Sequence, residues 1–138
     1  MPRRMDSGYD ANRIIILIAV LKKRLGLPLG MQDIFVNIAI AGDVKVKETS
    51  VDLAAACAIV SANSEFICPK DIVVFGEVGL AGEVRSVALC AEILSEAQKL
   101  GFKKAIIPKG SLKNLSYKGK TEVFGADTLE AAIKIFGN

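Results

Sequence analysis

A serine lies where an extended, charged segment gives way to an alanine-rich stretch, in "KETSVDLAAACAIVSA" from Lys47 to Ala62. A serine at the start of a helix can act as a nucleophile, because the free N–H groups there stabilise developing negative charge. A serine at this place can equally do no more than cap and begin the helix. The position of Ser50 therefore raises a choice between a hydrolase and a structural domain.

The absence of histidine narrows the chemistry that the chain can perform. With no histidine among 138 residues, Ser-His-Asp catalysis, Cys-His catalysis and histidine-bound zinc are excluded. Hydrolysis would have to use a Ser-Lys pair or paired carboxylates. The three cysteines, Cys57, Cys68 and Cys90, are far apart and form no CxxC motif, so we expect neither a disulfide framework nor a metal site. No GxxxxGK[ST] motif for nucleotide phosphates is present.

The composition indicates one globular domain that covers residues 1–138. Hydrophobic residues make up 51% of the chain and charged residues 24%, which is typical of a protein with a packed core. The longest apolar run, Ile14 to Leu21, is much shorter than the about 20 residues that cross a bilayer, so no membrane span is expected. The scattered cysteines favour a reducing, cytoplasmic compartment.

Hydrophobic periodicity predicts a mixed α/β domain with the element order α-β-β-α-β-β-α-β-β-α. The predicted helices cover residues 11–26, 49–63, 87–100 and 127–136. The predicted strands lie in "DIFVNIAI", "VKVKE", "DIVVFGEV", "GEVRSV", "KAIIP" and "TEVFGA". Asp10 is the expected cap of the first helix, and two capping boxes are expected, one from Thr49 to Asp52 and one from Asp127 to Glu130.

Five segments in a fixed order resemble one known family. "GYDANRIIILIAVLKKRLGL", "DIFVNIAIAG", "VDLAAACAIVSA", "FGEVGLAGEVRSV" and "EAQKLGFKKAIIP" are similar to the C-terminal domain of the bacterial DNA-repair RadA (Sms) family. The resemblance implies a fold like the proteolytic domain of Lon proteases. It also implies that a zinc finger and a RecA-like ATPase core belong to the full-length family protein, so that this fragment needs no cofactor and ATP, magnesium and zinc are expected only in the missing domains.

The resemblance to Lon also assigns the two catalytic positions. It places Ser50 in the nucleophile position and, fifteen residues beyond Gly76, Ala91 in the position of the activating lysine. The next lysine on that helix is Lys99, which lies about 12 Å further along the axis, whereas a Ser-Lys pair needs about 3 Å. Ser50 is therefore interpreted as a helix-start residue, and no catalytic residue is expected in this fragment.

An enzymatic alternative stays open beside that interpretation. Ser50 could serve a Lon-type serine peptidase with a non-standard base, Lys47 or Lys45, from the preceding segment. A third alternative is a domain that docks a protein partner, for which the sequence offers no motif.

The positive charge of the chain is unevenly placed. Although the net charge is only +3, seven lysines and no acidic residue lie from Lys99 to Lys120. A lysine run can be a solvated surface, but such an asymmetry suits phosphate contacts that are independent of base sequence. Arg85 could also contact DNA, or it could form a salt bridge with Glu77 or Glu83. The candidate DNA-binding residues are Arg85, Lys103, Lys104, Lys109 and Lys113.

The resemblance implies a role in DNA repair and recombination. Full-length proteins of that family are expected to be DNA-dependent ATPases or helicases that form hexameric rings and process branched DNA. For this fragment it implies a non-proteolytic scaffold that self-associates, in a hexameric ring, and contacts single-stranded or branched DNA without sequence preference. The apolar run from Ile14 to Leu21 is the expected source of subunit contacts.

Overall fold

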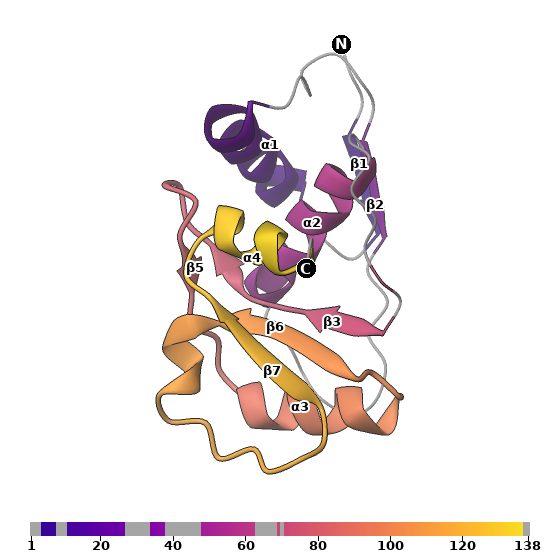
Figure 1. The fold of residues 1–138 in the computed structure, drawn as a ribbon. Helices are drawn as coiled ribbons and strands as arrows, with labels where there is room; N and C mark the ends of the chain where they lie inside the picture. Colours follow the sequence, from indigo (N-terminus) through magenta and orange to yellow (C-terminus); the bar gives the residue numbers. More distant parts are fainter. Residues whose placement is uncertain are drawn as a thin grey trace.

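A computed structural model describes residues 4–7, 11–26, 34–37, 48–62, 69 and 71–136. These residues form a mixed α/β structure, as predicted (Figure 1). The strands are β1 Arg4–Ser7, β2 Ile34–Asn37, β3 Ile72–Val74, β4 Glu77–Val78, β5 Val84–Arg85, β6 Lys104–Pro108 and β7 Glu122–Ala126. The α-helices are α1 Ala11–Leu25, α2 Asp52–Ala62, α3 Cys90–Lys99 and α4 Leu129–Phe136, with 3-10 helices η1 Glu48–Val51 and η2 Lys109–Leu112.

A three-stranded parallel sheet in the order β3-β6-β7 separates two hydrophobic clusters. Helix α3 covers one face of this sheet, while α2 and α4 lie on the other face (Figure 1). Side chains alternate across the central strand: Ala105 and Ile107 pack on the α3 side, and Ile106 packs on the α2 side. This alternation follows from the two-residue period of a strand and explains why every central residue of β6 is apolar.

Two smaller pairings complete the described strands. Strands β4 and β5 form an antiparallel hairpin, as the "GEVGLAGEVR" pattern predicts. Strand β1 pairs with β2 in parallel, with Arg4 opposite Ile34 and Ser7 opposite Asn37. The prediction missed β1, because "RMDS" has one apolar residue and no alternation, so that its strand conformation comes from pairing. Residues 44–47 of the predicted strand "VKVKE" and the cap Asp10 lie outside the described residues, while Glu48 begins η1.

The prediction of one continuous strand in "DIVVFGEV" is wrong. The segment divides at Phe75 and Gly76 into β3 and β4, which belong to different sheets. A Cβ atom on Gly76 would lie 2.9 Å from Val84 Cγ1 and 3.4 Å from Leu53 Cδ2. The chain bends at this glycine because only a residue without a side chain lets β5 and α2 approach so closely.

The helix starts also differ from the sequence-based expectation. Helix α3 begins at Cys90, after Leu89 with a φ of 61°, and not at Val87, because a left-handed residue interrupts the helical backbone. Helix α4 is capped by Thr128, whose hydroxyl accepts a hydrogen bond from Ala131 N at 3.1 Å, and not by Asp127. Helix α2 begins at Asp52 behind η1.

Helix α1 buries one broad face and leaves a narrow apolar stripe, Ile15 and Ala19, exposed. Leu17 and Leu21 are fully buried, and Ile18 and Val20 nearly so. On the opposite face, Ile15 is 53% exposed. None of the described helices combines the length and apolar character that a membrane crossing needs.

The close approach at Gly76 leads to a test of stability. We expect Gly76→Ala to lower the free energy of unfolding by about 3 kcal/mol, because the added methyl overlaps Val84 and Leu53. Gly26→Ala is the matched control, since Gly26 has a φ of +68° but no atom within 4 Å of a Cβ, and we expect it to cost only about 1 kcal/mol. Urea denaturation of both variants measures the difference. Equal losses would contradict the packing argument.

Candidate functional site

The start of α2 is closed off by the backbone of the bend between β3 and β4. Gly76 N donates a hydrogen bond to Ser50 O at 2.8 Å, and Leu53 N donates one to Gly76 O at 2.9 Å. Ser50 itself is only 4% exposed. The candidate nucleophile therefore lies inside the protein, and one of the N–H groups at the helix start is already bonded.

A buried carboxylate occupies the first residue of α2. Asp52 is completely buried and forms an ion pair with Arg13 Nη2 on α1. Asp52 Oδ2 also accepts a hydrogen bond from Val78 N at 3.2 Å, and Arg13 Nη2 donates one to Val78 O at 3.3 Å. The arginine and the carboxylate thus bind both backbone groups of one residue of β4, and together they join α1, α2 and β4. We call these three residues the Arg13–Asp52–Val78 clamp.

The clamp holds a negative charge, the Asp52 carboxylate, at the start of α2. A carboxylate there interacts favourably with the helix dipole, and its burial is compensated by the guanidinium and the backbone N–H. The same negative charge opposes an anionic tetrahedral intermediate at this helix end. The predicted capping box from Thr49 to Asp52 is replaced by these longer-range contacts.

The structure separates Ser50 from the position predicted for an activating lysine. Ala91 lies on α3, which covers the opposite face of the sheet from α2, and it lines a hollow beside residues 116–119. Lys99 lies on α3 too, with its Nζ 3.9 Å from Glu96 Oε2. Within the described ranges no hydrogen bond joins a lysine to the Ser50 hydroxyl. Lys45 and Lys47 lie outside the described residues.

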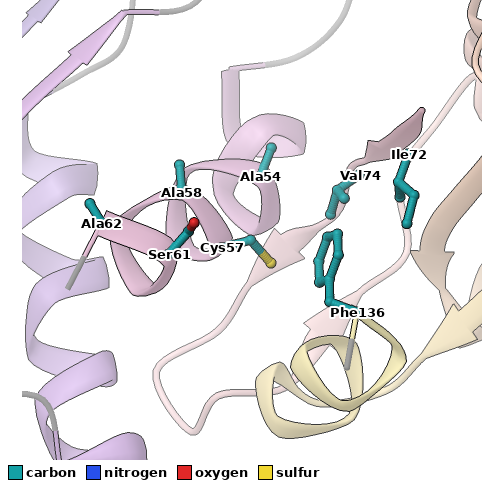
Figure 2. A pocket seen from close by; sticks show the side chains of 8 residues that line it. All are labelled: Ala54, Cys57, Ala58, Ser61, Ala62, Ile72, Val74 and Phe136. Atoms are coloured by element: carbon teal, nitrogen blue, oxygen red, sulfur yellow. The ribbon is translucent and has the colours of Figure 1, made fainter. Parts of the chain in front are cut away.

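An apolar hollow of about 420 Å³ lies along α2, β3 and α4. Figure 2 shows the Cys57 thiol and the Phe136 ring converging below Val74, with small side chains along the helix. Its lining contains no carboxylate, amine or guanidinium group. This arrangement offers apolar contact and no acid–base chemistry. The lining residues are Ala54, Cys57, Ala58, Ser61, Ala62, Ile72, Val74 and Phe136.

Cys57 and Cys90 both lie in the protein interior. Burial, and then the nearby Glu92 carboxylate, raise the pKa of Cys90 to about 11, so that the reactive thiolate is scarce at neutral pH. No cluster of three or more potential metal ligands occurs in the described part of the chain.

The predicted DNA-binding lysines fall into two groups at opposite ends of β6. Lys103 and Lys104 lie where the strand begins, and Lys109 and Lys113 lie in and directly after η2, where it has ended. Five residues of strand separate its two ends by about 13 Å. Lys104 is half-buried and is opposite Glu122 in the register. The four predicted lysines therefore lie in two groups at the two ends of β6.

Arg85 is held by a neighbouring carboxylate. Its Nη2 and Nε donate to Glu83 Oε2 at 3.0 and 3.2 Å. Hydrogen bonds from the backbone N–H of Glu83 itself and from Arg85 hold the pKa of Glu83 below its usual value, so the carboxylate is charged at neutral pH. Of the two interpretations of Arg85, the salt bridge to Glu83 is present, while Glu77 is its partner only in the strand register.

Three other lysines extend the group at the beginning of β6. Lys99 and Lys118 line the same hollow as Ala91, and Lys120 N donates to Gln98 Oε1 at 2.8 Å. Glu122 N donates to Lys103 O at 2.9 Å, which brings Lys103 to the same loop. Lys99, Lys103, Lys118 and Lys120 therefore gather around the end of α3, and we call them the loop lysines.

Two residues that organise these sites are not among the predicted site residues. Arg13 shows no pattern that would pair it with Asp52, because 39 residues separate the two in the sequence. An amide on a helix, such as Gln98, likewise carries no local signal for a partner 22 residues away.

The clamp can be tested through stability. We expect Arg13→Met to lower the free energy of unfolding by about 3 kcal/mol, because it removes the guanidinium partner of a fully buried carboxylate. Arg85→Met is the control, since its ion pair is exposed and its removal should change little. The double variant Arg13→Met/Asp52→Leu should recover part of the loss. Urea denaturation measures all three, and an Arg13→Met variant as stable as the wild type would contradict the role of the clamp.

Comparison with known proteins agrees with the sequence resemblance. Residues 11–111 match the model of the protein family described as subunit ChlI of Mg-chelatase. The chain is 46% identical over 135 residues to DNA repair protein RadA of Escherichia coli, covering 98% of this chain and 29% of that protein. It is 45% identical to DNA repair protein RadA of Haemophilus influenzae (99% of this chain, 29% of that protein). For the RadA protein of Aquifex aeolicus, the identity is 49%, over 78% of this chain and 24% of that protein. The chain thus spans less than a third of the length of these curated relatives.

Proposed function

The chain belongs to the family described as subunit ChlI of Mg-chelatase, and we propose that within this family it is a non-proteolytic DNA-contacting and self-associating domain of a DNA repair protein. The relatives that match nearly the whole chain carry the name DNA repair protein RadA, which favours DNA repair over chelation. In this proposal ATP, magnesium and zinc are bound by parts of such proteins outside this chain, and the protein works in the cytoplasm.

The gathering of the loop lysines is the observation that carries the proposal. Four lysine residues from α3, the segment before β6 and the loop before β7 share one end of the sheet. Phosphate groups bind to such clusters without a preference for base sequence. Few aromatic side chains accompany these lysines, so backbone contact and not base stacking is the proposed mode.

The geometry around Ser50 supports the non-proteolytic part of the proposal. A peptidase needs a nucleophile that its substrate reaches and an N–H group free for the oxyanion. Ser50 is buried, Leu53 N is bonded to Gly76 O, and Asp52 brings a negative charge to the same helix end. The alternative of a Ser50-dependent peptidase is therefore the weaker one.

The proposal predicts the salt dependence of DNA binding. A fluorescent single-stranded or branched oligonucleotide should bind to the chain and lose affinity by about 50-fold between about 50 and 200 mM salt, as four phosphate contacts imply. Fluorescence anisotropy measures this slope. An oligonucleotide affinity that does not change with salt, or no binding at low salt, would contradict DNA contact and favour a domain that docks a protein.

Self-association predicts a second outcome, measured by light scattering. A ring of six chains is the proposed assembly, and the exposed apolar stripe of α1 is its proposed contact. We expect Ile15→Glu to dissociate the assembly without unfolding the chain, because Ile15 is 53% exposed and a charge in an apolar contact is costly. Leu100→Glu, at an equally exposed leucine at the end of α3 (55%), should leave the assembly intact. A wild-type monomer at high protein concentration would contradict self-association.

A further inference from the structure

A polar hollow of about 350 Å³ lies between α3 and the loop before β7, on the face of the sheet away from the apolar hollow of α2. One wall comes from successive turns of α3 and carries Ser95 and Lys99. The other wall comes from the loop and carries Ser116, Lys118 and Gly119. Ala91, which stands in the predicted lysine position, contributes only a methyl group to this hollow, so it leaves room there.

A hydrogen-bond network centred on Gln98 fixes the shape of the hollow. Tyr117 Oη donates to Gln98 Oε1 at 2.5 Å, and Lys120 N donates to the same oxygen at 2.8 Å. Thr121 N in turn donates to Tyr117 Oη at 3.1 Å. A single amide oxygen thus binds the loop to α3 from two sides. The loop is positioned before any ligand arrives, which lowers the entropic cost of binding.

Gly119 shows how tightly the loop is packed against this network. A Cβ atom at this position would lie 2.0 Å from Gln98 Oε1 and 2.1 Å from Tyr117 Oη. A larger residue would displace the ends of these two side chains and disturb the network, so the backbone beside Lys118 lies directly against it. This contact places the Lys118 side chain next to the hollow from the side opposite to Lys99.

The charges around the hollow are positive. Its lining contains two lysines and no acidic residue. The nearest carboxylate partner is Glu96, whose Oε2 is 3.9 Å from Lys99 Nζ, and no ion pair within the described ranges engages Lys118. The end of a helix attracts cations, but three of the last carbonyls of α3 already accept backbone hydrogen bonds from Leu100, Gly101 and Phe102. The Lys118 ammonium group therefore remains available to an external anion, and the Lys99 ammonium group is held only by a long, largely exposed contact with Glu96.

We propose that this hollow binds a phosphate group of a nucleic acid strand, through the ammonium groups of Lys99 and Lys118 and the hydroxyl groups of Ser95 and Ser116. Lysine and serine side chains are the groups that hold phosphate oxygens in protein–DNA interfaces. Lys103 and Lys120 continue the positive surface beyond the rim, which suits a chain of phosphates better than a single anion. The inference rests on the proposed function and assigns it to one place.

The decisive comparison uses two double variants that remove equal charge. Lys99→Ala/Lys118→Ala removes both lysines that line the hollow. Lys109→Ala/Lys113→Ala removes two exposed lysines at the other end of β6. Binding of a fluorescent single-stranded oligonucleotide to the whole 138-residue chain is measured by anisotropy across a salt series. We expect the first variant to weaken binding at about 50 mM salt by about tenfold or more and to reduce the slope of log affinity against log salt by about 1.4. The second should cost less than about threefold. Equal losses in the two variants would overturn the assignment to the hollow while DNA contact itself stands.

A second measurement separates failure of the hollow from failure of the proposed function. Inorganic phosphate is titrated into the ¹⁵N-labelled chain, and the amide signals of Ser116, Lys118 and Gly119 are followed by NMR. Shifts that are absent in Lys99→Ala/Lys118→Ala support an anion site. If the wild type binds no oligonucleotide, the nucleic acid source is overturned, and these shifts then identify a site for free phosphate. If the wild type binds no oligonucleotide and also shows no shifts with up to about 100 mM phosphate, the site itself is overturned as well.

A third variant tests the positioning by Gln98 without a change of charge. Gln98→Leu keeps the size of the side chain and removes the oxygen that holds Tyr117 and Lys120. We expect a several-fold loss of oligonucleotide affinity with an unchanged salt slope, because the lysines remain but their positions are less well defined. Wild-type affinity in Gln98→Leu would show that the network does not position the lysines.

Discussion

The ion pair between Arg13 and Asp52 is the interaction on which the arrangement of the helices most depends. A carboxylate that is completely buried needs a charged partner and hydrogen bonds to be tolerated at all. Here the charged partner comes from α1, and a hydrogen bond comes from the backbone of β4. The clamp therefore fixes three elements that are far apart in the sequence, and the small side chains of α2 can pack closely because that helix is held at its first residue.

The same contacts account for the closed surroundings of Ser50. The clamp holds β4 close to α2, and the bend at Gly76 lets the chain reach that position. The Gly76 N–H donates to Ser50 O, and the Gly76 carbonyl accepts from Leu53 N. The start of α2 thus holds the structure together. Catalysis needs free N–H groups and an exposed hydroxyl at the helix start, and this packing buries or bonds those groups. Catalysis and structural packing therefore compete for the start of α2.

The sequence predicted elements where local pattern decides and failed where tertiary contacts decide. The strands β6 and β7 and the helix α1 follow from hydrophobic period, and their positions are confirmed. The division of "DIVVFGEV" could not be predicted, because a single glycine does not by itself end a strand and only the approach of Val84 and Leu53 forces the bend. Strand β1 has no pattern of its own. For the candidate sites, Ser50, Ala91 and the lysine asymmetry were visible in the sequence, but the clamp and the amide network were not, because each joins residues at least 19 positions apart.

The placement of the lysines shows why a charge count along the chain is a poor guide to a binding surface. Seven lysines from Lys99 to Lys120 look like one basic segment, but the fold divides them into two groups. Strand β6 carries Lys109 and Lys113 to one end of the sheet, whereas the loop before β7 brings Lys118 and Lys120 back to the end of α3, beside Lys99 and Lys103. Charges separated by more than about 10 Å are largely screened at physiological salt, so the two groups act largely independently. The group at the end of α3 has a hollow, a fixed loop and no acid in its lining. The other group lies in and after η2, which is joined to the segment after Arg85 by the hydrogen bond from Val87 N to Ser111 Oγ, and Arg85 is already paired with Glu83. Local geometry, and not net charge, therefore favours the α3 end as the place where an anionic strand is held.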